Sequence, residues 1–309
     1  MFLPARPCYN LNMDKVRIKA PAKVNFALGI TGESGGFHML DSIVCTIDLF
    51  DDVTVAKRSD GRVNITMCGM GSENIPPEAN NAVRAAELFA EKHSTGGADI
   101  TITKRIPMGA GLGGSSADAA GVLRAMSKLY GKGDEKTLGE IADMVGSDTR
   151  YMLRGGWARL RGRGNEVEPL KSRLKLSLLI LCPPLGVSTA QCYKLYDELP
   201  AESPADCAAA ALAAERGDLY VFCKNMRNAL YAPAVQINPD VLAAVRDIEE
   251  LEPVGACMTG SGSAVFGVFP AMAAARRALA DYGKKFRAIC AATYVPASKI
   301  KRNPAEQKS

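Results

Sequence analysis

The feature that most constrains the fold is a glycine-rich segment, PMGAGLGGSSAD at residues 107–118, which joins a strand pattern to a helix pattern. Before it, ADITITKRI alternates apolar and polar residues, which is the period of a strand with one buried face. After it, apolar side chains recur at the spacing of a single helix face, at Ala119, Val122, Leu123, Met126, Leu129 and Tyr130. The sequence therefore predicts a strand, a tight turn and a helix in direct succession.

Such a succession is typical of an anion-binding site. Glycine lets backbone N–H groups approach an anion closely, and the N-terminus of a helix carries about half a positive charge. Ser115 or Ser116 is the expected N-cap of the helix, and Gly131 is its expected end. Four glycines within six residues exceed what a simple strand–helix turn requires, so we predict a phosphate-binding loop.

Two common phosphate-binding loops do not fit this segment. Gly109, Gly111 and Gly114 satisfy G-x-G-x-x-G by count, but a dinucleotide fold also requires an acidic residue that ends a second strand about 20 residues on. That position falls in GKGDEKTLGE, a polar loop that enters a helix. In the Walker A pattern Ser115 occupies the lysine position, and the protein-kinase motifs are absent from the sequence.

The length of 309 residues indicates two domains that share one cleft. Strand and helix patterns alternate without a regular β–α–β rhythm, so we predict an α+β fold. The pattern restarts near residue 170, which predicts domains at 1–168 and 169–309. VRIKAPAKVNFALGI indicates two short strands broken at Pro21, and GSDTRYMLRGGWARLRGRGNEVEPL indicates strand interrupted by glycines.

Composition excludes several classes of protein. Nine cysteines without a C-x-x-C pair, together with only two histidines, argue against a disulfide framework and a zinc site, and they favour a reducing, cytoplasmic location. No apolar run reaches the ~20 residues of a membrane span, and the N-terminus lacks the apolar core of a secretory signal. A net charge of +5 with 6% aromatic residues falls short of a nucleic-acid-binding surface. We expect a small anionic ligand, no nucleic-acid or membrane partner, and a monomer or weak homodimer.

Three segments together resemble the motifs of the GHMP kinases. PMGAGLGGSSADAA is similar to their loop P-x-x-x-G-L-G-S-S-x-x-A, and PAKVNFALGI and MTGSGSAVFGVF are similar to the other two motifs, in the same order. The resemblance implies an N-terminal domain like domain 2 of ribosomal protein S5, a C-terminal ferredoxin-like domain, and an active site in the groove between them. It also implies an enzyme that transfers the γ-phosphoryl group of ATP to an alcohol with the help of Mg²⁺.

Two longer segments resemble one branch of these kinases, which phosphorylates the 2-hydroxyl of a cytidine-diphosphate-linked methylerythritol in the non-mevalonate isoprenoid pathway. PAKVNFALGITGESGGFHML is similar to its PAK-[ILV]-N-x-x-L…DGYHxL pattern, and GSDTRYMLRGGWARLRGRGNEVEPL is similar to GADVPFFLxGGxAxxxGxGExLxPL. The chain departs from the branch with GGFH in place of DGYH, with Arg150 where proline is usual, and with GLGGSSAD in place of GLGGGSS.

The resemblance implies which residues bind ATP and which react. Asp148 matches the aspartate that accepts a proton from the attacking hydroxyl, and Lys23 matches the lysine that orients this aspartate, stabilises the transferring phosphoryl group, or does both. Ser116 matches the serine near Mg²⁺ and the β- and γ-phosphates. The loop expected to bind ATP comprises Pro107, Met108, Gly109, Ala110, Gly111, Leu112, Gly113, Gly114, Ser115, Ser116 and Ala117.

Four further residues match acceptor-binding positions of the branch. Phe37 and Tyr193 match two rings that stack on cytosine, His38 matches a residue that reads the edge of the base, and Asn25 matches a substrate-contacting asparagine. Without the resemblance, Phe37 and His38 are typical of a core aromatic residue beside a hydrogen-bonded histidine, and Asn25 is typical of a structural residue at a strand edge. Asp118 is interpreted as a first-turn residue favoured by the helix dipole. TGSGSA near the C-terminus is expected to pack beside the phosphate loop.

Three alternatives remain open from the sequence. The acceptor could be homoserine or a sugar alcohol, as in other GHMP kinases. A kinase-like protein could bind nucleotide without turnover. The N-terminal fold type also serves nucleic-acid-binding proteins, although the charge and aromatic content argue against that class.

Overall fold

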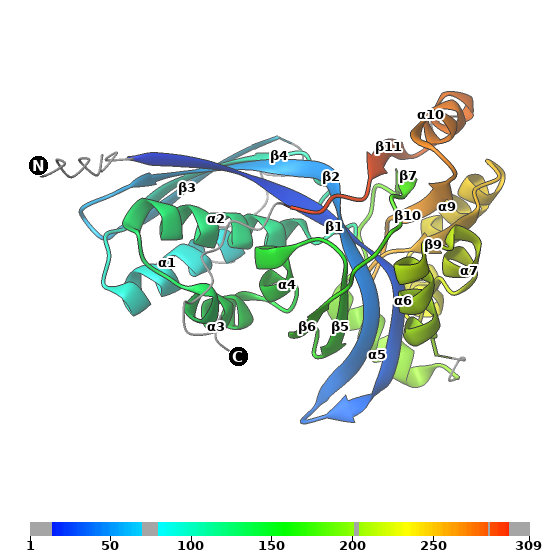
Figure 1. The fold of residues 1–309 in the computed structure, drawn as a ribbon, viewed down its shortest axis with the longest axis horizontal. Coiled ribbons are helices and arrows are strands. Elements are labelled where there is room, and N and C mark those ends of the chain that lie inside the picture. Colours follow the sequence, from blue (N-terminus) through cyan, green and yellow to red (C-terminus); the bar gives the residue numbers. More distant parts are fainter. Residues whose placement is uncertain (1–13, 70–79, 201–203, 284, 297–309) are drawn as a thin grey trace, which may run out of the picture.

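Two β-sheets and the helices that cover them make up the fold (Figure 1). The structure is a computed structural model that describes residues 14–69, 80–200, 204–283 and 285–296. The predicted α+β class is confirmed. None of the described helices is long and apolar enough to cross a membrane. Residues 1–13, on which the expected lack of a secretory signal rests, lie outside the described residues.

The larger sheet comes mainly from the N-terminal half of the chain. Its main path has the order β3–β4–β2–β1–β8, and β5 and β6 continue from β2. The strands are β1 Lys15–Ser34, β2 Phe37–Lys57, β3 Val63–Gly69, β4 Ala98–Lys104, β5 Ala158–Gly162, β6 Glu166–Pro169 and β8 Arg227–Asn228. Four helices lie on one side of it (Figure 1): α1 Asn81–His93, α2 Gly114–Tyr130, α3 Glu135–Val145 and α4 Thr149–Arg154.

The smaller sheet is antiparallel, with the order β11–β7–β10–β9. Its strands are β7 Ser177–Cys182, β9 Gly255–Met258, β10 Val265–Phe269 and β11 Arg287–Ala292. The helices of this half are α5 Thr189–Glu198, α6 Cys207–Arg216, α7 Leu219–Lys224, α8 Tyr231–Ile237, α9 Asp240–Glu249 and α10 Met272–Asp281. A helical crossover between β7 and β9, and α10 between β10 and β11, give the β-α-β-β-α-β order of a ferredoxin-like fold.

The two halves are not separate along the chain. Strand β8 belongs to the C-terminal half, yet it pairs in parallel with β1 of the larger sheet. The predicted division between residues 168 and 169 stays a prediction.

Two local expectations are wrong. VRIKAPAKVNFALGI lies in one strand, β1, because the pairing with β2 shifts register between Pro21 and Lys23, so the residue without an N–H group falls at an irregularity. Residues 149–154 form a helix rather than a strand. A helix of six residues is too short for apolar periodicity to reveal it.

The middle of β1 carries the site because it is buried throughout. Residues 20–29 are all buried, since α2 packs against β1 and the C-terminal elements α6 and β8 pack against it as well. Phe26 anchors this arrangement, because its fully buried ring contacts one ring of the N-terminal half and two of the C-terminal half. These partners are Trp157 at 5.2 Å, Phe222 at 5.4 Å and Phe266 at 5.3 Å between ring centroids.

Replacement of Phe26 should therefore weaken both halves together. Phe26→Ala is expected to lower the free energy of unfolding by about 3–5 kcal/mol, because it opens a cavity among three other rings. Urea denaturation followed by circular dichroism measures the change. Leu212→Ala, at a side chain that is 46% exposed, is the control and should cost less than about 0.5 kcal/mol. A loss below about 1 kcal/mol for Phe26→Ala would contradict this role of the cluster.

Candidate active site

The predicted phosphate loop connects β4 to α2 and ends in an open helix N-terminus. Gly109, Gly111 and Gly113 have φ angles of +66°, +74° and +72°, a left-handed region that favours glycine. The expected N-cap serines are wrong, because Gly113 occupies the N-cap position and α2 begins at Gly114. Gly113 has no side chain with which to bond the first N–H groups of α2, so these groups are available to an anion.

Hydrogen bonds from two other segments fix the carbonyl groups of this loop. The backbone N–H of Lys23 donates to Leu112 O at 3.0 Å, and that of Ala264 donates to Ala110 O at 3.1 Å. The Thr259 hydroxyl donates to Gly111 O at 3.4 Å. The expected packing of TGSGSA beside the loop is therefore confirmed.

Thr259 also connects the loop to β1. Its hydroxyl oxygen accepts a hydrogen bond of 2.9 Å from the backbone N–H of Asn25, and its side chain is fully buried. The sequence placed Thr259 in the TGSGSA segment but gave it no role of its own, since a threonine before glycine is common in tight turns. Gly111 packs so closely on this residue that a Cβ atom there would overlap the carbonyl oxygen of Thr259.

Lys23 is a buried lysine with two partners. Its side chain is 5% exposed, and its ammonium lies 3.5 Å from Asp148 Oδ2. The ammonium also donates to Asn25 Oδ1. Asn25 Nδ2 donates to the Ser42 hydroxyl at 2.9 Å, which turns the amide oxygen of Asn25 toward Lys23. Burial of an ammonium requires such compensation, so this pair and its amide support are a specific arrangement.

Asp148 occupies the N-cap position of α4 but makes no capping bond, so its carboxylate is free to face Lys23. The side chain is 32% exposed, which leaves it accessible from the cleft. Arg150 stands where the related kinases usually have proline, and its side chain points away from the cleft. Its guanidinium bonds both oxygens of Asp143 on α3, at 2.6 and 2.5 Å, and packs against Gly139. Arg150 therefore connects α4 to α3 and is not among the residues that line the cleft.

One cleft brings the predicted catalytic and acceptor-binding residues together. It is lined by Lys23, Asn25, Phe37, His38, Ser116, Asp148 and Tyr193, and by Gly109, Gly111, Gly113, Gly114 and Ser115 of the loop. These residues come from β1, β2, α2, α4 and α5, so both halves of the chain contribute. The phosphate loop forms one wall.

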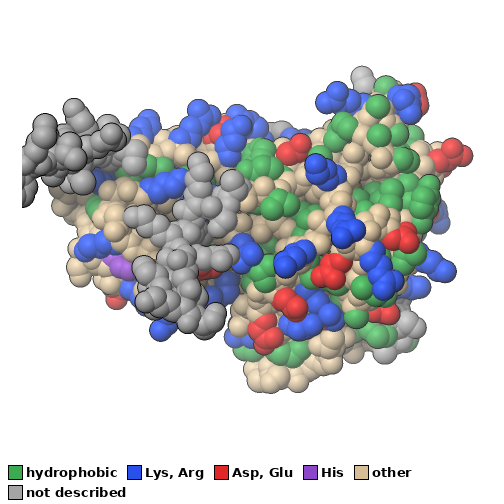
Figure 2. Space-filling model, viewed as in Figure 1, with side chains coloured by type: hydrophobic (Ala, Val, Ile, Leu, Met, Phe, Trp, Pro, Cys, Tyr) green, Lys and Arg blue, Asp and Glu red, His purple; other side chains and the backbone are tan. Residues whose placement is uncertain are grey.

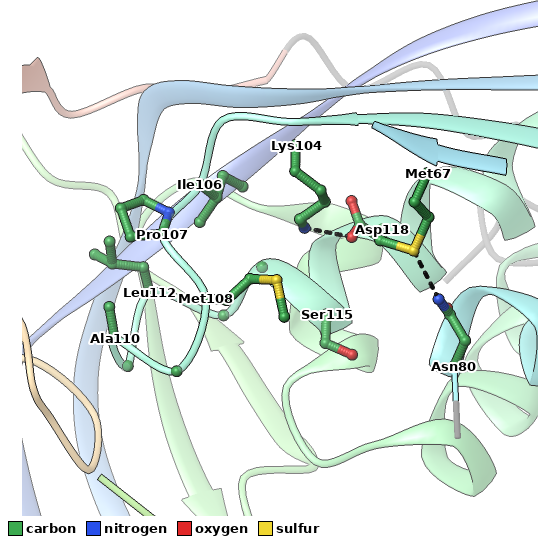
Figure 3. Close-up of a pocket in the computed structure, with 14 residues that line it drawn as sticks. Met67, Asn80, Lys104, Ile106, Pro107, Met108, Ala110, Leu112, Ser115 and Asp118 are labelled. Atoms are coloured by element: carbon green, nitrogen blue, oxygen red, sulfur yellow. Dashed lines mark hydrogen bonds and ion pairs between the residues drawn. The ribbon is translucent and has the colours of Figure 1, made fainter. Parts of the chain in front are cut away.

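A second pocket lies on the other side of the loop (Figure 3). Pro107, Met108, Ala110 and Leu112 line it, and Ala117 is buried in the first turn of α2. Other lining residues that the sequence did not indicate are Met67, Asn80, Lys104, Ile106 and Asp118. Apolar side chains at the loop and on β3 make this pocket suitable for a flat ring.

Partners that are distant in sequence hold the acceptor side of the cleft. The guanidinium of Arg163, in the turn between β5 and β6, lies 3.6 Å from the centroid of the Phe37 ring. His38 Nε2 lies 2.7 Å from Asp197 Oδ1. The His38 ring stacks on Tyr193 with 4.9 Å between centroids. Burial, with Asp148 nearby, raises the pKa of Tyr193 far above its usual value, so its phenol stays neutral. The predicted stacking of Phe37 and Tyr193 on a base stays a prediction.

The cleft fits a magnesium ion that ATP carries with it. Within the described residues, no group of three or more His, Cys, Asp or Glu side chains could hold a metal by itself. Magnesium bound through substrate phosphates needs only one or two protein oxygens, with water completing its shell. Ser116 lines the cleft beside the loop and offers one such oxygen.

Comparisons with known proteins agree with this geometry. Residues 80–158 match the GHMP kinases N terminal domain, and residues 208–287 match the GHMP kinases C terminal family. The chain is 33% identical to 4-diphosphocytidyl-2-C-methyl-D-erythritol kinase of Clostridium beijerinckii over 89% of this chain and 98% of that protein. It is 37% identical to the kinase of the same name from Caldicellulosiruptor saccharolyticus, over 82% of this chain and 87% of that protein.

Solved structures show the same likeness. A crystal structure of 4-(cytidine 5'-diphospho)-2C-methyl-D-erythritol kinase has a TM-score of 0.72 and 30% identity, and covers 90% of this chain and 98% of its own. Homoserine kinase from Cytophaga hutchinsonii also has a TM-score of 0.72, at 20% identity, over 95% and 98% of the two chains. The second match shows the fold alone.

A side chain at Gly111 should destabilise the protein by more than the strain of a left-handed alanine alone. Gly111→Ala is expected to lower the free energy of unfolding by about 2 kcal/mol or more, because the new Cβ overlaps a backbone oxygen that does not rotate away. Gly131→Ala is the matched control: its φ of +65° is similar, but the space around it is open. It should cost about 1 kcal/mol. Urea denaturation provides the comparison, and equal losses would contradict the close contact with Thr259.

Proposed function

Because this chain belongs to the GHMP kinases, in the family of the 4-diphosphocytidyl-2-C-methyl-D-erythritol kinases, we propose that it phosphorylates the 2-hydroxyl of 4-diphosphocytidyl-2-C-methyl-D-erythritol from ATP. The chain is thus an ATP-dependent phosphotransferase with an alcohol acceptor, in isoprenoid biosynthesis. One observation carries the proposal: Lys23 and Asp148 lie 3.5 Å apart in the cleft whose wall is the phosphate loop.

ATP spans the loop. Its triphosphate lies against the backbone N–H groups of residues 109–116 and the start of α2, which together supply positive potential without a Walker lysine. Its base lies in the second pocket, where Met67, Ile106 and Met108 offer apolar contacts. Residues of the loop line both the second pocket and the cleft, so the γ-phosphoryl group of a nucleotide bound across the loop lies in the cleft, on the side of Lys23. Ser116 would hold a magnesium ion that the phosphates carry, and this ion would neutralise their charge.

Asp148 accepts the proton of the attacking hydroxyl. Its carboxylate is not used as a helix cap and faces the cleft, so a hydroxyl bound there is within reach. Lys23 holds this carboxylate from the buried side and directs positive charge at the transferring group. Asn25 fixes Lys23 through its amide oxygen. Phosphoryl transfer depends mainly on alignment and charge, which this arrangement supplies.

The cytidine end of the acceptor binds at the rim formed by Phe37, His38 and Tyr193. Aromatic rings favour a base by stacking, worth about 1–3 kcal/mol per base. Asp197 engages Nε2 of His38, which leaves Nδ1 for the edge of the base. Homoserine has no base to stack, so the aromatic residues at this rim favour the cytidylyl acceptor over the homoserine alternative.

The partners of the chain are then ATP and one small molecule. Basic side chains are spread over the face in Figure 2 and interspersed with acidic ones, which supports a small-molecule partner over a nucleic acid. The eight cysteines among the described residues are all free thiols, which supports a reducing, cytoplasmic location. We further propose a monomer or a weak homodimer.

Removal of the Asp148 carboxylate tests the function directly. Asp148→Asn is expected to lower kcat about 10²- to 10⁴-fold, because the proton acceptor is lost while the phosphate loop is intact. A coupled assay of ADP release with the cytidylyl-methylerythritol acceptor measures turnover, and calorimetry with a non-hydrolysable ATP analogue should show unchanged binding. Asp134→Asn is the matched control, since Asp134 caps α3 and asparagine caps equally well. Equal rates for Asp148→Asn and the parent would remove Asp148 from the mechanism.

Replacement of Phe37 tests the acceptor. Phe37→Ala should raise the KM for the cytidylyl acceptor about 5- to 150-fold, the equivalent of ~1–3 kcal/mol of stacking, with the KM for ATP unchanged. Phe50→Ala on the same strand is the control, because Phe50 packs on Tyr294 and does not line the cleft. An unchanged acceptor KM in Phe37→Ala would refute the stacking role.

A further inference from the structure

A buried cluster of three charged side chains lies beneath the phosphate loop, and two of its members, Lys104 and Asp118, also line the second pocket. The Lys104 ammonium lies between the carboxylates of Asp51 and Asp118. Figure 3 shows the contact with Asp118, which is 2.5 Å to Oδ2. The three side chains are 3%, 0% and 5% exposed. The expectation that Asp118 is a first-turn residue favoured by the helix dipole is therefore wrong: it lies beyond the first turn of α2 and is buried in an ion pair.

The cluster bonds to both ends of the loop. Asp51 Oδ1 accepts hydrogen bonds from the backbone N–H groups of Arg105 and Ile106, at 2.5 and 2.9 Å, where the chain leaves β4. Asp118 lies in α2, where the loop ends. Lys104, the last residue of β4, joins the two carboxylates. The ammonium also lies under the helix start, 3.4 Å from where a Cβ of Gly114 would be.

We propose that Asp51, Lys104 and Asp118 are positioning residues that hold both ends of the phosphate loop in the ATP-binding geometry. They set the affinity for ATP without contacting its phosphates. This inference rests on the proposed function, because it assumes that the loop binds the triphosphate. The loop needs such support, since three of its glycines have left-handed φ angles and a free loop would visit many other conformations. Holding a binding loop in its bound geometry lowers the entropy cost of binding.

The charges of the cluster argue against a direct electrostatic role. Asp51 and Lys104 offset each other, and burial raises the pKa of Asp118 to about 7, so the cluster carries a charge between 0 and −1, which does not attract a triphosphate. A cluster that attracted ATP would have the opposite sign. Asp118 Oδ1 is buried and has no hydrogen-bond partner among the described residues, whereas Oδ2 accepts a hydrogen bond from Lys104.

Two substitutions at Asp118 separate positioning from electrostatics. Asp118→Ala removes both the charge and the link to Lys104, whereas Asp118→Asn removes the charge and keeps an oxygen that accepts from Lys104. If the cluster positions the loop, Asp118→Ala weakens binding of a non-hydrolysable ATP analogue with Mg²⁺ on the order of 10- to 100-fold, as loss of a hydrogen bond to a charged group does. Asp118→Asn should restore the dissociation constant to within about threefold of the parent.

Calorimetry on the full chain measures the dissociation constant of the analogue, and steady-state assays measure kcat and the KM for ATP. The loss should appear in the KM for ATP more than in kcat, because Lys23 and Asp148 are untouched. Asp99→Ala, which removes an ion-paired carboxylate at the other end of β4, is the control and should bind the analogue as the parent does. Asp118→Ser is the second variant if Asp118→Ala does not fold.

An unchanged dissociation constant in Asp118→Ala, or equally altered constants in Asp118→Ala and Asp118→Asn, would overturn the inference. The calorimetric measurement does not require the acceptor. A parent chain that binds the analogue but does not phosphorylate the cytidylyl acceptor would therefore refute the proposed function and leave this inference standing.

Discussion

The site depends on the hydrogen bonds that fix the carbonyl groups of the phosphate loop. The carbonyl oxygens of three consecutive loop residues, 110–112, each accept one hydrogen bond. The donors, in the order of these residues, are the Ala264 N–H, the Thr259 hydroxyl and the Lys23 N–H. Since the carbonyl oxygens are occupied by the protein, the loop is held with its N–H groups free for an anion. The same bonds bring β1, and with it the Lys23 side chain, against the loop. The C-terminal half is thus needed to shape a loop that belongs to the N-terminal half.

Two buried lysines occupy opposite sides of this loop and differ in their partners. Lys23 has one carboxylate, Asp148, and one neutral amide, so the pair is balanced and open to the cleft. Lys104 lies between two carboxylates and is closed to solvent. An accessible, balanced pair is suited to proton and phosphoryl transfer, whereas a closed cluster is suited to holding backbone in place. The contrast explains how one short loop both binds ATP and keeps its shape.

Sequence patterns predicted the α+β class, the glycine loop and the residues that meet in the cleft, because these depend on local periodicity and on motifs. They did not predict what depends on distant packing. Pro21 suggested a strand break, yet pairing with β2 absorbs it. Asp118 had the position of a helix-dipole residue, but its burial beside Lys104 depends on β4 and β2. Site residues also contact side chains that are distant in sequence, and no local pattern indicates such contacts. Asn25 contacts Thr259, Phe37 contacts Arg163, and His38 contacts Asp197.

The central claim is that Asp148 receives the proton of the acceptor hydroxyl while the phosphate loop presents ATP. The most direct measurement is a crystal structure with a non-hydrolysable ATP analogue, Mg²⁺ and the cytidylyl-methylerythritol acceptor. If Asp148 accepts the proton, the reacting hydroxyl lies about 2.6–3.2 Å from an Asp148 carboxylate oxygen and faces the γ-phosphoryl group. A hydroxyl more than about 5 Å from Asp148, with no water between them, would contradict it.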